Sequence, residues 1–421
     1  MPRDGLTVML VTPNLDIGGA QETARTLAKY LPRAGCRTIV CTFRDGPLRS
    51  DIERLGVPVE ILPARRHDVL ALPWFLVEMV RLRRTMLRLV EEHGVDVVQV
   101  QTLGTPAFLT MTLRVRGRVQ VWWRVPNIIF LVREDTVGPH RWLLGAKRAA
   151  HRWLYRNGAR LVDGVIAVSD EVAHAFCRTV GYHGDGVEVV ANGVDVERYP
   201  AAADRGEIRS RLGFGPDDHL MTMVGTFKRQ KGHRFLVEAT ASIVARFPAL
   251  HVLLVGDGDL KDEIGAQVQE IGLSGRIHFL GSRRDVADLL LASDSFVLPS
   301  LWEGFSVALI EAMASRLPVI ATAVSGTTQV MIDGATGWLV PPADADALAA
   351  AMIQLLSDRD RAAAVAATAH DRVAASFGAG AQAERLAALF GRKLPSGRVT
   401  SDREPLSRLT EEPRPEVAGG S

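Results

Sequence analysis

The chain has 421 residues, 47% hydrophobic and 23% charged, so it is long enough for two or three domains and apolar enough to bury a core in each. Its 50 basic and 48 acidic residues nearly cancel, which excludes a uniformly basic nucleic-acid-binding protein. Its 3 scattered cysteines exclude a disulfide scaffold and a zinc site built from close cysteine pairs. No signal sequence is recognisable, and no run of about 18 uncharged apolar residues occurs. The sequence therefore predicts a cytoplasmic protein without a membrane span.

Short β-branched runs alternate with longer helical patterns through the first half of the chain. Strands are predicted at 7–13, 38–43, 95–100, 119–124, 164–168 and 187–190, and helices at 20–34 and 74–92. This alternation is typical of β-α-β units, which form a parallel sheet covered by helices on both faces.

The pattern breaks at 196–219, which is rich in proline, glycine and charge and is interpreted as the connection into a second domain. A second series follows, with strands predicted at 220–224, 251–255, 277–280, 295–298 and 318–321, and helices at 232–246, 260–271 and 305–315. The predicted fold class is therefore α/β, with two doubly wound, Rossmann-like domains that face each other across a cleft.

The predicted domain bounds follow from these breaks. The first domain is expected at 1–195 and the second at 196–376. A helix at 377–392 is expected to pack back on the first domain. Residues 393–421 contain several prolines and no aromatic residue, so a disordered tail is predicted there.

The strongest local motif follows a predicted buried strand and reads Ser-Leu-Trp-Glu303-Gly304-Phe-Ser, with Glu311 eight residues after Glu303. Glu303 is expected in the strand-to-helix loop, where Gly304 lets the backbone approach a ligand closely. Glu311 is expected about 12 Å further along the helix. The free N–H groups at the start of that helix suit a phosphate. An alternative stays open, in which Glu303 caps the helix and Glu311 is a solvated surface residue.

Two further loops have features that suit an anion. Lys228 and Lys231 lie between a predicted strand and a predicted helix, where their ammonium groups can reach a diphosphate, although a solvated basic turn is the alternative. Gly18 and Gly19 follow the first strand at the start of a helix and form a second phosphate cradle. The motif is not G-x-G-x-x-G, and no acid ends the next strand, which argues against a nicotinamide dinucleotide.

The spacing of Glu303 and Glu311 resembles the E-x7-E motif of retaining glycosyltransferases of family 4, which have the GT-B fold. Further motifs similar to those of this family occur in chain order at 18–20, 189–195, 224–232, 254–258, 279–281, 309–314, 318–322 and 337–341. The resemblance covers residues 5–392 and is most specific at 220–342.

The resemblance implies a nucleoside-diphosphate sugar as donor, bound mainly by the second domain. Glu303, with the backbone of Gly304 and Phe305, is expected at the sugar hydroxyls, Glu311 at the ribose and Lys231 at the diphosphate. The other donor-binding residues implied are Gly18, Gly19, Gly225, Thr226, Ser306 and Arg283. No metal or cofactor is implied, so the Asp-Gly-Asp run at 257–259 is interpreted as the family's Gly-Asp-Gly loop rather than a metal site.

The chain departs from the family pattern at several positions on the donor side. Thr226 stands where arginine is common, and Lys228 is expected to replace that catalytic cation. Gln329 stands where glutamate is common, and Arg316 where glycine is common.

The departures from the family pattern are larger in the first domain, which the resemblance places on the acceptor side. A histidine often follows the fourth strand or ends the fifth, and this chain has none there. Gln101, Arg124 and Asn127 are instead the candidates near the reacting sugar.

The function expected is transfer of a sugar, with retention of configuration, to a hydroxyl of a polysaccharide, glycan or lipid-linked acceptor. Such an enzyme is a hexosyltransferase of class EC 2.4. Fixed cations and helix N–H groups would stabilise the charge that develops on the leaving diphosphate. Two alternatives remain: a catalytically weak sugar-nucleotide-binding or partner protein, and a dinucleotide oxidoreductase.

The charge is unevenly distributed. Residues 1–200 hold 27 basic and 21 acidic residues, whereas 201–421 hold 23 and 27. The span 81–160 holds 15 basic and 5 acidic residues with four tryptophans among them. This composition suits peripheral contact with an anionic membrane at the inner face of the cell. An ordinary helix covering a sheet also explains 74–92, and this interpretation is favoured because helices in such folds are largely covered. Nucleic acid is not expected, because no reader motif accompanies the charge.

Overall fold

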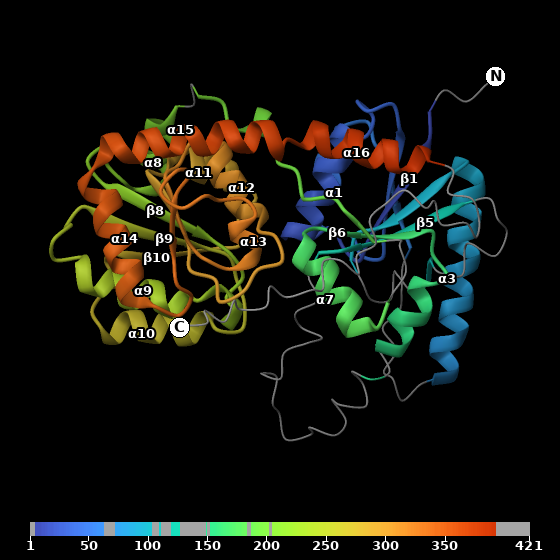
Figure 1. The fold of residues 1–421 in the computed structure, drawn as a ribbon, viewed down its shortest axis with the longest axis horizontal. Coiled ribbons are helices and arrows are strands. Elements are labelled where there is room, and N and C mark those ends of the chain that lie inside the picture. The colour runs from blue at the N-terminus through green and yellow to red at the C-terminus, as the bar shows by residue number, and fades with distance from the viewer. Residues whose placement is uncertain are drawn as a thin grey trace, which may run out of the picture.

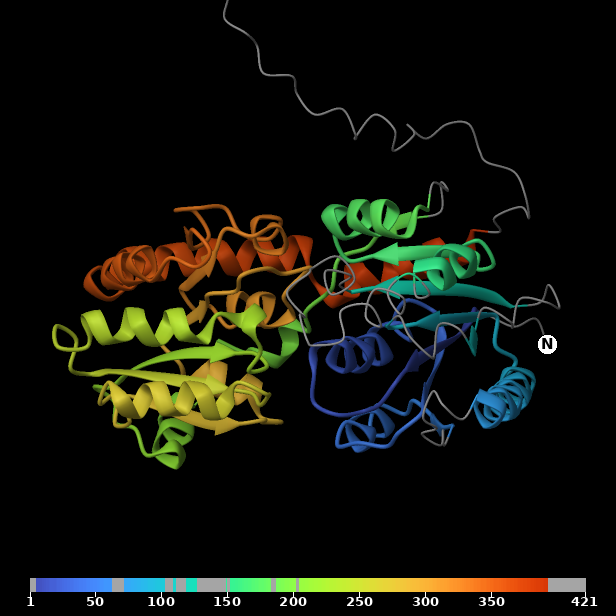
Figure 2. The ribbon, with the colours of Figure 1, turned by 90° about the horizontal axis from the view of Figure 1, so that it is seen from below.

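The computed structural model describes residues 5–62, 72–102, 109–110, 119–126, 149, 152–182, 187–201 and 204–392. Within them the chain forms two α/β units that lie next to each other (Figure 1). The view turned by 90° shows helices on both sides of the strands in each unit (Figure 2). The predicted pair of doubly wound units is confirmed, while the predicted tail at 393–421 lies outside the described residues.

The first unit is built on a seven-stranded parallel sheet in the order β3-β2-β1-β4-β5-β6-β7. Its strands are β1 (Thr7–Thr12), β2 (Arg37–Thr42), β3 (Val59–Ile61), β4 (Val97–Val100), β5 (Gln120–Val125), β6 (Gly164–Ala167) and β7 (Val187–Val189). Its helices include α1 (Gly19–Tyr30), α2 (Arg49–Glu53), α3 (Leu72–His93) and α7 (Asp170–Val180).

The second unit is built on a six-stranded parallel sheet in the order β10-β9-β8-β11-β12-β13. Its strands are β8 (His219–Val224), β9 (Leu250–Val255), β10 (Ile277–Gly281), β11 (Ser295–Leu298), β12 (Val319–Thr322) and β13 (Trp338–Val340). Its helices are α8 (Arg205–Leu212), α9 (His233–Ile243), α10 (Lys261–Glu270), α11 (Val286–Ala292), α12 (Val307–Ala314), α13 (Ser325–Thr328), α14 (Ala345–Ser357) and α15 (Arg359–Ser376).

Each sheet is buried on both faces because its side chains alternate between two helical layers. In β1, Val8 and Leu10 join a cluster with α1 and α16 (Ala379–Gly391), whereas Met9 and Val11 join a cluster with α3 and α7. This is why the strands read as continuous apolar runs rather than as alternating ones.

The chain crosses between the units twice, and the two crossings are hydrogen-bonded to each other. The Val194 N–H donates to the Phe377 carbonyl at 2.8 Å, and the Ala379 N–H donates to the Val194 carbonyl at 2.9 Å. Beyond this point α16 (Ala379–Gly391) packs on the first unit, where its Phe390 ring centroid lies 5.9 Å from that of Trp122. Figure 1 shows α15 and α16 running along one side of both units.

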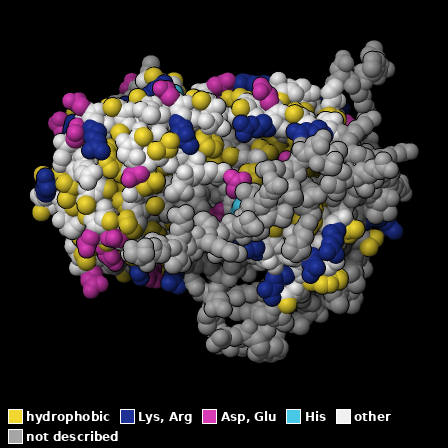
Figure 3. All heavy atoms as spheres, viewed as in Figure 1, with side chains coloured by type: hydrophobic (Ala, Val, Ile, Leu, Met, Phe, Trp, Pro, Cys, Tyr) yellow, Lys and Arg dark blue, Asp and Glu magenta, His cyan; other side chains and the backbone are white. Residues whose placement is uncertain are grey.

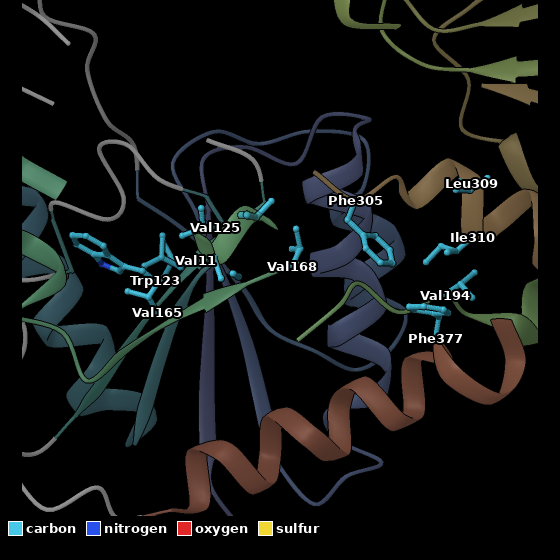
Figure 4. Packing of buried hydrophobic residues seen from close by; sticks show 14 of the residues in the cluster. Val11, Trp123, Val125, Val165, Val168, Val194, Phe305, Leu309, Ile310 and Phe377 are labelled. Carbon is cyan, nitrogen blue, oxygen red and sulfur yellow. The ribbon is translucent and has the colours of Figure 1, made fainter. Parts of the chain in front are cut away.

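The apolar core continues across the junction between the units. Figure 4 shows Phe305, Leu309 and Ile310 of the α12 region close to Val194 and Phe377. The rings of Phe305 and Phe377 are 5.7 Å apart. The start of α12 is therefore anchored against both crossings, which fixes it at the boundary between the two sheets.

The connection predicted at 196–219 contains a helix that the sequence analysis missed. α8 belongs to the second unit, because Arg209 donates to the Asp294 carboxylate at 3.0 Å and to the Ala292 carbonyl at 3.1 Å. Its buried face is a guanidinium held by oxygen atoms rather than an apolar stripe, so the helix carries no hydrophobic periodicity.

Two of the tryptophans expected at a lipid surface lie in the core instead. Trp122 and Trp123 are 1% and 0% exposed, and an added Cβ on Gly164 or Gly158 would lie 2.3 Å from their rings. Trp153 remains exposed, at 64%. None of the helices in the described ranges has the length and apolar character needed to cross a bilayer.

The described part of α3 behaves as an ordinary covering helix. Leu82, Met86 and Val90 are buried, while Arg81 is exposed. Figure 3 shows Lys and Arg side chains gathered at the lower right, on the first unit, and acidic side chains at the lower left, on the second.

Candidate functional site

A cleft of about 600 Å³ lies between the two units at the carboxyl ends of their strands, and both units line it. It gathers all the candidate residues of the sequence analysis that the structure describes: Gly18, Gly19, Gln101, Arg124, Gly225, Thr226, Lys228, Lys231, Arg283, Glu303, Gly304, Phe305, Ser306 and Glu311. Asn127 lies outside the described residues, next to Pro126, which lines the cleft.

The centre of the second-unit wall is an ion pair. The Lys231 Nζ atom lies 2.5 Å from Glu303 Oε1, and the buried Ser300 hydroxyl donates to the same oxygen at 2.7 Å. Gln230 Nε2 donates to Glu303 Oε2 at 3.3 Å. Glu303 does not cap α12, because the side chain of Ser306 accepts the Leu309 N–H there. The capping interpretation of Glu303 is therefore wrong.

Two glycines allow the loops after β8 and β11 to pack closely against each other. Gly232 adopts φ +68°, and a Cβ on it would lie 2.0 Å from the Pro299 carbonyl oxygen. A Cβ on Gly225 would lie 3.2 Å from Lys231 Cδ, so the aliphatic stem of Lys231 passes directly over Gly225. The two glycines allow the loop after β8 to fold tightly against the loop after β11.

Two helix N-termini meet across the cleft. α1 begins after Gly18, which has no side-chain cap, and α12 begins after Ser306. A Cβ on Gly19 would lie 3.9 Å from Val307 Cγ2, which places the first turns of the two helices in contact distance. Each N-terminus carries unpaired N–H groups and a partial positive charge. Together with Lys231, which lines the same cleft, they form a site that favours a multiply charged anion.

Glu311 is buried in α12, so the interpretation of it as a solvated surface residue is wrong. Burial, and then the charge of Glu22, raises its pKa from 4.5 to about 7. The charge of Arg198 and the hydroxyl of Tyr199 offset part of this shift. The Tyr199 hydroxyl makes no hydrogen bond of regular geometry among the described residues, so it acts on Glu311 through proximity.

Glu22 is a cleft residue that the sequence analysis missed. It lies in the first turn of α1, forms an ion pair with Arg25 at 2.5 Å, and bonds Arg198 of the connection. The available signal was an acidic residue three positions after the glycine pair, in the first turn of the predicted helix. Glu22 raises the pKa of Glu311 because the two units pack against each other, although the two residues are far apart in the sequence.

The remaining second-unit candidates differ in how they are held. Arg283 is paired with Asp285 at 2.6 Å, and Arg284 reaches Asp51 of the first unit at 3.0 Å. Lys228 is exposed and has no acidic partner among the described residues, so its ammonium group is free to meet a ligand.

The acceptor-side candidates lie at the ends of neighbouring strands. Gln101 directly follows β4, and Arg124 is in β5. Arg124 is 1% exposed and donates to Asn192 Oδ1 at 2.7 Å. Burial lowers the pKa of its guanidinium to about 10, so the group is charged at neutral pH.

Within the described ranges, no group of three or more His, Cys, Asp or Glu side chains is placed to hold a metal ion. In the predicted Gly-Asp-Gly loop, Asp257 Oδ1 accepts the Gly258 N–H at 2.8 Å. Gly258 itself adopts φ +155°, and a Cβ there would lie 2.7 Å from the Phe227 carbonyl oxygen. This loop is thus shaped by close backbone packing, and the expected metal independence stays a prediction.

Comparison with solved structures assigns the fold. Anabaena HepE, solved in complex with UDP-glucose, superposes with a TM-score of 0.75 at 21% identity, over 91% of this chain and 98% of that one. WaaG, a glycosyltransferase involved in lipopolysaccharide biosynthesis, superposes with a TM-score of 0.70 at 17% identity, over 91% and 99%. The two facing units have the GT-B fold.

Comparison with protein families assigns the class. Residues 204–372 match the family described as glycosyl transferases group 1, and residues 17–198 match glycosyltransferase family 4. The chain belongs to glycosyltransferase family 4.

Its curated relatives act on different acceptors. A UDP-Gal:alpha-D-GlcNAc-diphosphoundecaprenol alpha-1,3-galactosyltransferase of Escherichia coli is 29% identical over 50% of this chain and 56% of its own length. A D-inositol 3-phosphate glycosyltransferase of Corynebacterium urealyticum is 25% identical over 85% and 87%. The chain thus spans about half the length of the first relative and most of the second.

Proposed function

We propose that the protein transfers a sugar from a nucleoside-diphosphate sugar to a hydroxyl of a polysaccharide, glycan or lipid-linked acceptor. The transfer retains the anomeric configuration. The observation that carries the proposal is the Lys231–Glu303 pair, which lines the same cleft as the N-termini of α1 and α12. Two similar proteins support a donor of this class. The Escherichia coli protein is named for UDP-Gal, and the Anabaena protein was solved in complex with UDP-glucose.

Each wall of the cleft receives a part of the donor. The N-termini of α1 and α12 bind the diphosphate together with Lys231, and Lys228 supplies a second, mobile cation. Glu303 and the adjacent Gly304 face the sugar hydroxyls. Glu311 lies deeper and accepts from the ribose. The donor is therefore bound mainly by the second unit, and the first unit presents the acceptor.

The reaction breaks the bond between the anomeric carbon and the diphosphate oxygen. Negative charge develops on the leaving diphosphate, where the Lys231 ammonium and the helix N–H groups are already oriented to stabilise it. The acceptor hydroxyl attacks the anomeric carbon from the face that the diphosphate leaves, and its proton passes to the departing phosphate oxygen. The new bond then has the configuration of the old one.

Two described carboxylates support this route because neither is free to act as a nucleophile. Glu303 is held by Lys231 and Ser300. Glu22 is held by Arg25 and Arg198. We also propose that no metal takes part, since Lys231 and the helix N-termini supply the positive charge that a metal supplies elsewhere.

The test is donor turnover by the full chain. Sugar nucleotides are supplied with and without candidate acceptors and with EDTA, and the release of nucleoside diphosphate and the anomeric configuration of the product are measured. Transfer that retains the configuration and survives EDTA is expected. A chain that binds a sugar nucleotide but never releases the diphosphate would instead be the catalytically weak binding protein.

Contact with an anionic membrane is a separate part of the proposal. Trp153 and Leu161 are 64% and 50% exposed, and exposed arginines lie among them at 152, 156 and 160. Indole and guanidinium groups together suit the headgroup region of an anionic bilayer. Such contact would place the protein at the inner face of the cell membrane, where lipid-linked acceptors are found.

A further inference from the structure

The described part of the chain contains two almost fully buried arginines, and they differ in how they are satisfied. Arg209, 6% exposed, donates to the Asp294 carboxylate and to the carbonyls of Ala292 and Gly215. Arg124, 1% exposed, donates through Nη2 to Asn192 Oδ1 at 2.7 Å and to the Val190 carbonyl at 3.4 Å. Its Nη1 atom is buried without a partner, and no carboxylate pairs with it in the described ranges.

Such an arrangement is unfavourable in an unliganded protein. A guanidinium keeps its charge under all ordinary conditions, and a buried charge is costly unless an opposite charge or a full set of acceptors compensates it. Burial is also the sole influence on the pKa of Arg124, which falls to about 10 with no acidic side chain to offset it. Arg124 therefore lacks a counter-charge that a ligand can supply.

Gln101, which lies beside Arg124, also has buried polar atoms without a hydrogen-bond partner among the described residues. β4 and β5 pair in parallel with Gln99 opposite Trp122, so Gln101 and Arg124 come next in register and lie on the same face of the sheet. The amide nitrogen and oxygen of Gln101 are both buried and unpartnered. Gln101 and Arg124 both line the cleft. The first-unit wall thus presents unused N–H donors and no described acid beside them.

These donors are separate from the diphosphate site. The diphosphate is placed at the N-terminus of α1, which follows β1, whereas Arg124 is in β5, two strands away across the sheet. Two strand spacings are about 10 Å. The group that Arg124 meets is therefore carried by another part of the bound substrates.

We propose that Arg124 and Gln101 form a subsite for an oxyanion, a carboxylate or a phosphate, carried by the acceptor or by the transferred sugar. The inference rests on the proposed function and adds the chemical class of the substrate to it. The guanidinium fork matches the two oxygens of a carboxylate or phosphate, and the Gln101 amide adds a donor beside it. A neutral sugar would leave the buried charge uncompensated, so the subsite discriminates in favour of an anionic substrate.

The experiment uses the full chain, thermal unfolding and calorimetric binding. The donor arm compares UDP-glucuronate with UDP-glucose. The acceptor arm, with UDP present, compares sn-glycerol 3-phosphate with glycerol and glucuronate with glucose. The variants are Arg124→Met, which removes the charge but keeps the length, and Arg209→Met, a matched control at a fully satisfied arginine.

We expect wild type to bind the anionic probe at least tenfold more tightly than its neutral counterpart in one arm, which identifies the anion's source. Arg124→Met should lose this preference, keep the stabilisation by UDP, and unfold close to the wild-type temperature. Arg209→Met should unfold well below it. Equal binding of anionic and neutral probes in both arms, with UDP still stabilising, would overturn this inference and leave the proposed function standing. A wild type that none of UDP, GDP and ADP stabilises would contradict the proposed function itself.

A structural role for Arg124 gives a different result. If Arg124→Met unfolds as early as Arg209→Met, Arg124→Gln is measured, because its amide retains a donor for Asn192 without the charge. A folded Arg124→Gln that has lost the anion preference supports the subsite. A folded Arg124→Gln that keeps the preference, or unfolding of both variants, overturns it.

Discussion

The Lys231 ammonium and the Glu303 carboxylate lie 2.5 Å apart although 72 residues separate them in the chain. They meet because β8 and β11 are neighbours in the second sheet and each residue lies in the loop after its strand. The cation is thus positioned before any ligand binds, and the carboxylate that positions it also faces the place proposed for the donor sugar. Pre-positioned charges of this kind cost no reorganisation during the reaction.

Replacing Lys231 with alanine should reduce turnover by orders of magnitude while the protein stays folded. The variant removes the charge that stabilises the leaving diphosphate, whereas Glu303 keeps its hydrogen bonds from Ser300 and Gln230. Steady-state kinetics and circular dichroism measure the two effects. Arg229→Ala is the matched control, because it removes an exposed cation from the same turn. Turnover near the wild-type rate in Lys231→Ala would remove Lys231 from the mechanism.

Glu311 should make nucleotide binding depend on pH. Because its pKa is raised from 4.5 to about 7, the carboxyl is largely protonated at pH 6 and ionised at pH 8. An ionised carboxylate accepts the ribose hydroxyls more strongly, so the affinity for UDP should rise across this range. Calorimetric titration at several pH values measures it. Glu311→Gln should bind more weakly at pH 8 and show a flatter profile, and an unchanged profile would contradict the assignment.

The same shift has the opposite effect on the unliganded protein. The folded state binds the Glu311 proton more tightly than the unfolded state does, so this group stabilises the fold fully below pH 4.5 and loses its contribution as pH rises to about 7. The free energy of unfolding in urea should therefore fall less steeply over this window in Glu311→Gln than in wild type. Identical slopes in the two proteins would show that Glu311 has an ordinary pKa.

Gly326 should be essential for the shape of the donor site. A Cβ at this position would lie 2.8 Å from the Glu303 carbonyl oxygen and from the Gly304 carbonyl carbon, so Gly326→Ala has to displace the loop that presents Glu303. We expect weaker sugar-nucleotide binding by at least tenfold. Gly265→Ala is the control, since nothing lies within 4 Å of its Cβ position in α10, and it should stabilise the protein by about 0.5–1 kcal/mol. Unchanged donor affinity in Gly326→Ala would refute this constraint.

Membrane contact predicts salt-sensitive binding to vesicles that contain anionic lipid. Trp153→Ala should weaken co-sedimentation severalfold, because it removes the exposed indole of the proposed surface. Trp123→Phe is a control for the tryptophan content, since Trp123 is fully buried. Absence of binding by wild type at low salt would remove the membrane proposal and leave the cleft untouched.

Much of the fold could be predicted because buried parallel strands are continuous apolar runs, as in β1 and β11. Some of the elements that were not predicted lack that signal. β3 and β13 are three residues each, and α8 buries Arg209 rather than an apolar stripe. Arg316, where relatives often carry glycine, adopts φ 58° in the left-handed region, so the family's glycine marked a backbone requirement that this chain meets with arginine.

The second-unit wall of the site was predictable because its residues fall in short local motifs, at 224–232 and 300–311, that follow a known spacing. The contacts between distant segments and between the two units could not be predicted. The proximity of Glu22 to Glu311 and the unpaired Nη1 of Arg124 depend on how distant segments pack, and no local pattern records them. The tryptophans show the same limit, since Trp122 and Trp153 look alike in the sequence but lie in the core and on the surface.

The central claim is that the cleft between the two units binds a nucleoside-diphosphate sugar through Lys231 and the two helix N-termini. A thermal-unfolding panel of nucleoside diphosphates and their sugars on wild type and Lys231→Ala tests it most directly, because binding to the folded state raises the unfolding temperature as ligand concentration rises. We expect a concentration-dependent rise for at least one nucleoside diphosphate in wild type and a much smaller rise in Lys231→Ala. No rise for any compound in wild type, or an equal rise in both proteins, would contradict it.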